Sequence, residues 1–233
     1  MRSFLQLINW EFKLLQRNSI ISISLIVTAI YGALLFFLRE LPYLDEFTIA
    51  MVLNDPTVVG YFFIALGIFT EIKTGVLAAL FVSPVKLHQY LWSKVMAISL
   101  LGTICALLLI ISVKGMDFNW ASYTIGSLLI CLLSSILGLI TLTYTDDFLN
   151  FALLSVPVFL SFVVVPLLHF LGVIELGTFI YLFPIQAGLS LIEHAVLDHS
   201  FSLVYCLLAS IISIGGLYYF TYKRFQNTIH LKF

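Results

Sequence analysis

One amphipathic stretch of the chain, residues 71–94, has opposite charges at its two ends. Glu71 lies at its start and Lys94 at its end, with a turn signal at Ser83–Pro84 between them. A carboxylate at the end of an apolar run can cap the next helix, or pair with an arginine on the N-terminal interfacial segment or on a partner protein. The aromatic and aliphatic residues of this stretch offer anchors of the kind that dominate protein interfaces. We interpret it as a docking segment, with an ordinary solvated loop as the alternative.

Other residues with chemical potential form weaker patterns. His169, His194 and His199 fall close together in the sequence, but their spacing matches no regular metal-ligand pattern, so we predict no metal site and leave their role open. We expect the adjacent carboxylates at 146–147 to lie in a solvated turn rather than to bind a metal ion. The three cysteines lie in apolar runs without a CxxC spacing, which predicts small buried side chains rather than redox or zinc chemistry.

Catalytic sets are missing from the sequence. An intramembrane enzyme would need a pair such as Ser and His or two Asp within apolar segments, and His169 is the only histidine in such a segment. The sequence also lacks GxxxxGK[ST], the loop that cradles nucleotide phosphates. We therefore predict that the chain is not an enzyme and binds no cofactor itself.

The composition places the chain in a membrane. Of its 233 residues 61% are hydrophobic and 10% are charged, whereas soluble domains have about 45–50% and about 25%. A net charge of −1 gives no field that would hold a nucleic-acid backbone. These values exclude a soluble enzyme, a disordered chain and a nucleic-acid binder, and they make membrane lipids the surroundings of the chain.

Apolar runs predict an all-α polytopic protein with six transmembrane helices. Each run is close to the roughly 20 residues that a spanning helix needs. The runs are approximately 19–38, 57–73, 95–113, 121–144, 151–172 and 201–222. Only the second contains charges, Glu71 and Lys73. The lack of ionisable groups in the other five argues against a secondary transporter or proton pump.

Basic residues indicate the orientation. With the N-terminus inside, nine of the 11 Lys and Arg fall on the inner side and only Arg39 and Lys114 on the outer side. This asymmetry follows the positive-inside rule. It predicts a multi-pass protein with both termini in the cytoplasm.

Three further segments complete the predicted architecture, a single membrane domain over residues 1–233. Residues 1–18 have apolar side chains at helical spacing and predict an amphipathic helix in the inner interface. Residues 173–200 are apolar but interrupted by Pro184, which predicts two re-entrant half-helices on the outer side between spans five and six. Span five contains Pro157 and Pro166, and with Pro184 these are candidate gating or cavity residues, because proline bends helices.

The charged stretch resembles a known family. The pattern E-x-x-x-G-x-L-x-x-L-x-V-[ST]-P, followed about ten residues later by Lys, is similar to the permease subunits of type-2 ABC exporters, and most similar to the short permeases of fluoroquinolone and drug efflux. The matching residues are Glu71, Gly75, Leu77, Leu80, Val82, Ser83, Pro84 and Lys94. The segment 182–187 and the pair Asp55–Pro56 also fit, whereas Val76 replaces the family's frequent Thr.

The resemblance implies an assembly in a bacterial cytoplasmic (inner) membrane. Two ABC ATPase subunits would bind ATP and Mg and dock on residues 74–94, and a second permease, identical or related, would complete a dimer. Coupling to the ATPase would involve Glu71, Gly75, Leu80, Ser83, Pro84, Tyr90 and Lys94. The function implied is outward transport of a hydrophobic or amphiphilic substrate. The alternatives are a haem-export subunit for cytochrome maturation and a non-transporting membrane immunity protein.

Overall fold

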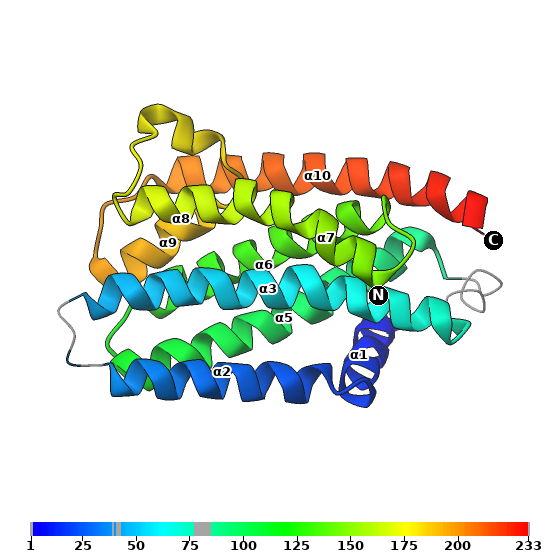
Figure 1. Cartoon of the computed structure of the whole chain (residues 1–233), viewed down its shortest axis with the longest axis horizontal. Helices are drawn as coiled ribbons and strands as arrows, with labels where there is room; N and C mark the ends of the chain where they lie inside the picture. Colours follow the sequence, from blue (N-terminus) through cyan, green and yellow to red (C-terminus); the bar gives the residue numbers. More distant parts are fainter. Residues whose placement is uncertain (1, 39, 41–42, 77–84, 233) are drawn as a thin grey trace.

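The computed structural model describes residues 2–38, 40, 43–76 and 85–232, which form a bundle of helices whose long members run side by side (Figure 1). Within these ranges no strand occurs. The helices are α1 (Arg2–Arg17), α2 (Ile20–Phe37), α3 (Leu44–Lys73), α5 (Leu87–Lys114), α6 (Trp120–Leu142), α7 (Phe148–Phe159), the π-helix η1 (Leu160–Val164), α8 (Val165–Phe170), the 3-10 helix η2 (Gly177–Leu182), α9 (Gln186–Leu197) and α10 (Leu203–Lys232).

Six helices in the described part of the chain are long and apolar enough to cross a membrane. They are α2, α3, α5, α6, the continuous run Phe148–Phe170 that comprises α7, η1 and α8, and Leu203–Asn227 of α10. The predicted all-α fold with six membrane-spanning helices is therefore confirmed. The length of the apolar runs was sufficient for this prediction. The hydrocarbon core of a bilayer contains no water, so the backbone N–H and C=O groups of a spanning segment must form hydrogen bonds within the helix.

Helix α3 differs from the predicted second span. It begins at Leu44, 13 residues before the predicted start at 57, so Asp55 lies within the helix and not in an outer loop. The Asp55 side chain is buried, and the Thr28 hydroxyl of α2 donates a hydrogen bond to its carboxyl at 3.3 Å. The prediction that Asp55 lies in a solvated outer loop was wrong, because Thr28 of the neighbouring helix α2 supplies a hydrogen-bond partner inside the bundle.

Helix α6 is the centre of the bundle, packed against α3, α5, α9 and α10. Its small residues let α3 approach closely: a Cβ added at Gly138 would lie 2.5 Å from the Tyr61 carbonyl oxygen. The Tyr61 hydroxyl then donates to the Thr141 hydroxyl at 2.7 Å. Small residues and buried hydroxyls are the usual means of helix packing in membranes, where apolar surface alone gives no driving force.

Helices α2, α7–α8 and α10 lie at the periphery. Only 11% of the apolar window of α10 is buried, against 78% for α6. A Cβ added at Gly215 or Gly216 of α10 would meet no described atom within 4 Å. The exposed apolar faces of these helices are suited to contact with lipid or with another membrane protein.

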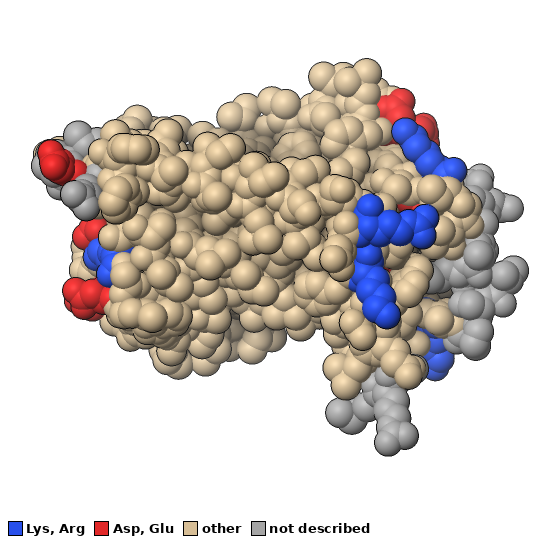
Figure 2. Space-filling view, turned by 90° about the horizontal axis from the view of Figure 1, so that it is seen from below, with Lys and Arg blue, Asp and Glu red and all other residues tan. Residues whose placement is uncertain are grey.

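Charge is separated along the bundle. We call the end that holds α1, residues 74–76 and the end of α10 the basic end, and the end that holds residues 115–119 and 173–202 the acidic end. Figure 2 shows most of the visible Lys and Arg at the basic end, Asp and Glu at both ends, and an uncharged band between the two ends. This separation has the form that the positive-inside rule describes.

Two shorter segments have defined forms. Helix α1 turns sharply from α2 at Ser19, which has a φ of 60°, and lies across the basic end (Figure 1). The segment 173–200 consists of η2 and α9, with Pro184 between them. The places of α1 and of this segment relative to a bilayer stay predictions.

Candidate functional site

A buried ionic cluster joins three helices at the basic end. Glu71 lies in the last turn of α3, Tyr90 and Lys94 lie one turn apart near the start of α5, and Glu11 lies in α1. Because i and i+4 side chains share a helix face, Tyr90 and Lys94 both reach Glu71. We call these four residues the Lys94 cluster.

The geometry of the Lys94 cluster is tight. Lys94 Nζ donates to Glu71 Oε1 at 2.5 Å and to Glu11 Oε2 at 2.9 Å. The Tyr90 hydroxyl donates to Glu71 Oε2 at 2.5 Å. All four side chains are buried, with 1–3% of each residue exposed. Charge-assisted hydrogen bonds of this kind are about twice as strong as neutral ones, so the cluster fixes α1, α3 and α5 to one another.

The charges of the Lys94 cluster do not cancel, since two carboxylates share one ammonium. Burial raises the pKa of Glu11 to about 7, against the attraction of Lys94 and together with the repulsion of Glu71. Glu11 Oε1 is buried and has no hydrogen-bond partner in the described part of the chain. Glu11 is therefore the member that takes up a proton most readily, and a proton there makes the cluster neutral.

The structure places some predicted coupling residues and not others. Gly75 follows the end of α3 with a φ of 71°, a left-handed conformation that glycine adopts without strain. Leu80, Ser83 and Pro84 lie outside the described residues. Coupling by any of the seven residues stays a prediction.

Sequence reasoning missed Glu11, which it assigned to the polar face of α1. The available signal was its spacing from Leu15, four residues later and also buried. A charged residue on the buried face of an amphipathic helix needs a partner. For Glu71, the expected partner was an arginine or a helix N-terminus, and the structure gives Lys94.

Aromatic side chains extend the link from α5 to α10. The Tyr218 hydroxyl and His88 Nδ1 are 2.8 Å apart, and the Tyr218 ring lies 4.7 Å from the Trp92 ring, centroid to centroid. These contacts lie beside the Lys94 cluster on α5. They connect the last spanning helix to the same end of the bundle.

The candidate gating prolines frame a local change in helix geometry. The π-helix η1 lies between Pro157 in α7 and Pro166 in α8. Proline removes a backbone donor, and wider π turns are a common response to an interrupted α-helical ladder. Pro184 lies between η2 and α9. A gating role for the three prolines stays a prediction.

Two of the three histidines near the acidic end close turns. His169 Nδ1 lies 3.0 Å from the Ile174 carbonyl oxygen, beyond the end of α8. His194 Nδ1 lies 2.9 Å from the His199 carbonyl oxygen, beyond the end of α9. In the described residues, no group of three or more His, Cys, Asp or Glu is arranged to hold a metal ion.

The paired carboxylates at 146–147 lie between α6 and α7. The Asp147 side chain accepts a hydrogen bond from the Asn150 backbone N–H at 2.7 Å and caps α7. This is a structural use of the kind that the turn interpretation expected.

The fold is that of a multi-pass helical membrane protein, and the Lys94 cluster joins three of its helices, α1, α3 and α5, at the basic end. The family model that matches is that of the fluoroquinolones export permease protein family, over residues 2–232. The chain belongs to this family, and the family name makes it a drug-export permease, a transport protein rather than an enzyme. Among curated proteins no relative matches it.

Proposed function

We propose that the chain is the membrane subunit of an ABC exporter in a bacterial inner membrane. Two partner ATPase subunits bind ATP and Mg and power the export. Membership of an export permease family supports a transport role. The absence of GxxxxGK[ST] from the sequence supports an energy source on another chain.

The Lys94 cluster carries the proposal. The predicted docking region, residues 74–94, directly follows the end of α3 that holds Glu71, and it contains Tyr90 and Lys94. Glu71 accepts hydrogen bonds from both Tyr90 and Lys94, and Lys94 also donates one to Glu11 of α1. We expect a movement that the ATPase imposes on this region to act on α1, α3 and α5 together.

A second permease, identical or related, completes the substrate path. The peripheral helices α2, α7–α8 and α10 support this, because their apolar faces are left open by the chain's own packing. Aromatic residues make up 15% of the sequence. Apolar and aromatic surfaces suit a hydrophobic or amphiphilic substrate.

Orientation is tested by thiol labelling. The proposed orientation puts both termini and the basic end in the cytoplasm. The native cysteines are buried, so they give little background. A membrane-impermeant maleimide should label Asp117→Cys in intact cells and Asp147→Cys only after permeabilisation. The reverse pattern would overturn the orientation.

Partnership is tested by purification. The tagged chain, extracted from its native membrane in mild detergent, should carry an ATPase with vanadate-sensitive activity. Glu71→Ala and Leu80→Asp should abolish the association or the coupled activity, whereas Lys73→Ala, at an exposed neighbour of Glu71, should not. A chain that purifies without ATPase activity contradicts the proposal and favours the immunity interpretation.

A further inference from the structure

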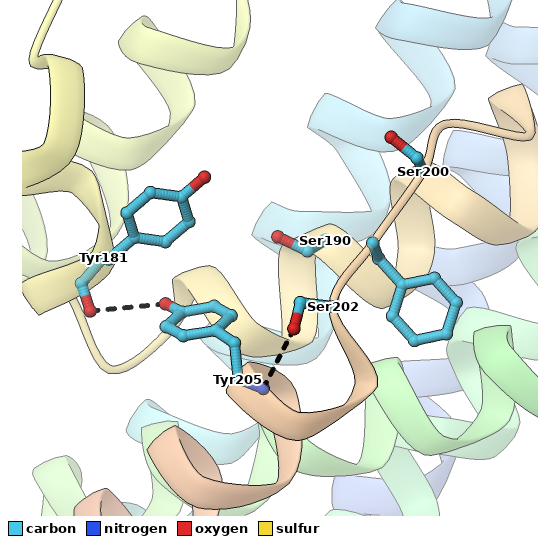
Figure 3. Close-up of a pocket in the computed structure, with 6 residues that line it drawn as sticks. Tyr181, Ser190, Ser200, Ser202 and Tyr205 are labelled. Atoms are coloured by element: carbon cyan, nitrogen blue, oxygen red, sulfur yellow. Dashed lines mark hydrogen bonds between the residues drawn. The ribbon is translucent and has the colours of Figure 1, made fainter.

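Two adjoining cavities open at the acidic end, between η2, α9 and the start of α10. Their volumes are about 310 and about 340 Å³. They share Tyr181, Ser190 and Ser200 in their walls and form one groove, which we call the outer groove. Figure 3 shows Ser190 of α9 and Ser200 on one side of it and Tyr181 of η2 on the other. The outer groove has the size of a small-molecule site.

One part of the outer groove is aromatic. The rings of Tyr181 and Tyr205 lie 4.9 Å apart in an edge-on arrangement. The Tyr205 hydroxyl donates to the Tyr181 carbonyl oxygen at 3.3 Å (Figure 3), and Phe201 also lines the groove. Such rings accept flat apolar groups and attract cations through their faces.

The other part of the outer groove holds two acceptors that have no partner among the described residues. Glu193 of α9 lines it, and in the described residues its carboxyl has neither a hydrogen bond nor an ion pair. Burial raises the pKa of Glu193 to about 7, the direction expected for a carboxyl without a cation beside it. Gln186, 7% exposed, also lines the groove; its Oε1 has no partner in the described residues, whereas its Nε2 lies 3.4 Å from Ser190 Oγ.

Two of the nearby donors, Lys114 and His169, already have partners within the chain. Lys114 Nζ bonds to the Val196 carbonyl oxygen at 2.6 Å and to Asp45 at 3.0 Å. The His169 ring is bonded to the backbone beyond α8. Because buried acceptors are costly when unpaired, the outer groove is complementary to a ligand that brings its own positive donor.

We propose that the outer groove binds an organic cation with an aromatic body, with Glu193 as its counter-ion, Gln186 Oε1 as an acceptor, and Tyr181 and Tyr205 as its aromatic wall. Only the source of the ligand depends on the proposed export function, because the ligand would be a cationic drug that the protein exports. Binding itself needs no ATPase.

The test is ethidium binding to the purified full-length chain, measured by fluorescence in detergent. Ethidium is aromatic and permanently charged, so its own charge does not change with pH. Glu193→Gln, which keeps the shape and removes the charge, should weaken binding about tenfold. Glu175→Gln, which removes an exposed carboxylate at the same end of the bundle, should leave binding unchanged.

Two further measurements locate the site. Bound ethidium should slow maleimide labelling of Ser190→Cys, and Ser190→Leu, which fills the groove and keeps Glu193, should weaken binding as Glu193→Gln does. Thermal unfolding of each variant reports whether it is folded. Equal ethidium affinity of Glu193→Gln and the wild type would overturn the proposal, and so would labelling of Ser190→Cys that ethidium leaves unchanged. Neither result bears on co-purification with an ATPase, and a chain without ATPase still reports on the groove.

Discussion

The Lys94 cluster at the basic end holds a buried carboxyl that has partners within the chain, whereas the outer groove at the acidic end holds a partly buried carboxyl that has none among the described residues. Glu71 accepts hydrogen bonds from both Tyr90 and Lys94 within the chain. Glu193 accepts none from the described residues, although burial raises its pKa. A satisfied cluster stabilises helix positions, whereas an unsatisfied acceptor in a cavity is ready for a ligand. This difference indicates that the Lys94 cluster links helices, whereas the outer groove is suited to binding a ligand.

Removing the ammonium should have the largest effect. Lys94→Met leaves two buried carboxylates without a counter-ion, and loss of one partner of a buried ion pair costs about 3–5 kcal/mol. We expect a clearly lower thermal unfolding midpoint in detergent. Lys86→Met, at an exposed site, is the matched control. Equal midpoints for the two variants would show that the cluster does not hold the helices.

Removing one donor should have an intermediate effect. Tyr90→Phe keeps the ring and deletes the hydroxyl that donates to Glu71 Oε2. Hydrogen bonds to charged groups contribute about 1.5–3 kcal/mol, so we expect a smaller fall in the unfolding midpoint than for Lys94→Met. Tyr205→Phe, at the outer groove, should change stability less, because the Tyr205 hydroxyl lies in a partly open wall. A reversed order would contradict the contrast between the two regions.

Glu11 should make stability depend on pH. Its pKa is raised from 4.5 to about 7 in the folded chain, so the folded state binds more protons than the unfolded state between these values. Its contribution to the free energy of unfolding is full below about pH 4.5 and is lost as the pH rises through about 7. Relative to the wild type, Glu11→Gln should therefore gain stability between pH 5 and pH 8.5. Parallel pH profiles of the two unfolding midpoints would show that Glu11 is not the titrating group.

Neutralising Glu193 should have the smallest effect, and one of opposite sign to Lys94→Met. Burial raises the pKa of Glu193 to about 7, as it raises that of Glu11. Above pH 7 the unpaired carboxylate of Glu193 therefore destabilises the folded chain. Glu193→Gln should raise the unfolding midpoint at pH 8, by an amount of the order of 1 kcal/mol, and change little at pH 5. A loss of stability at pH 8 would mean that Glu193 already has a partner, and that the outer groove is not vacant.

Local signals predicted the spans and part of the site. Apolar length gave the six spanning helices, and the charged stretch drew attention to Glu71 and Lys94. Contacts between helices were not predictable in the same way. Asp55 was taken as an outer-loop residue because nothing near it in the sequence announces Thr28, its partner on α2. Glu11 has its partner 83 residues away.

The acidic end was predicted least well. Pro184 indicated an interrupted segment, and the structure has η2 and α9 on its two sides. The outer groove depends on Glu193 and Gln186 facing the same space, and their sequence spacing alone is an ordinary helical pattern. The sequence left the role of the histidines open. His169 and His194 lie within hydrogen-bond distance of backbone carbonyls five residues on, and these contacts depend on the exact ends of α8 and α9.

The central claim is that the Lys94 cluster transmits the work of a partner ATPase to the spanning helices. The most direct measurement is ATP-driven accumulation of a fluorescent fluoroquinolone in inside-out vesicles, for the wild type and for a variant that combines Glu11→Gln, Glu71→Gln and Lys94→Met. The variant has no unpaired charge in the cluster, so it should fold and insert into the membrane. The account predicts that ATP-driven transport is lost. Transport at the wild-type rate would contradict it.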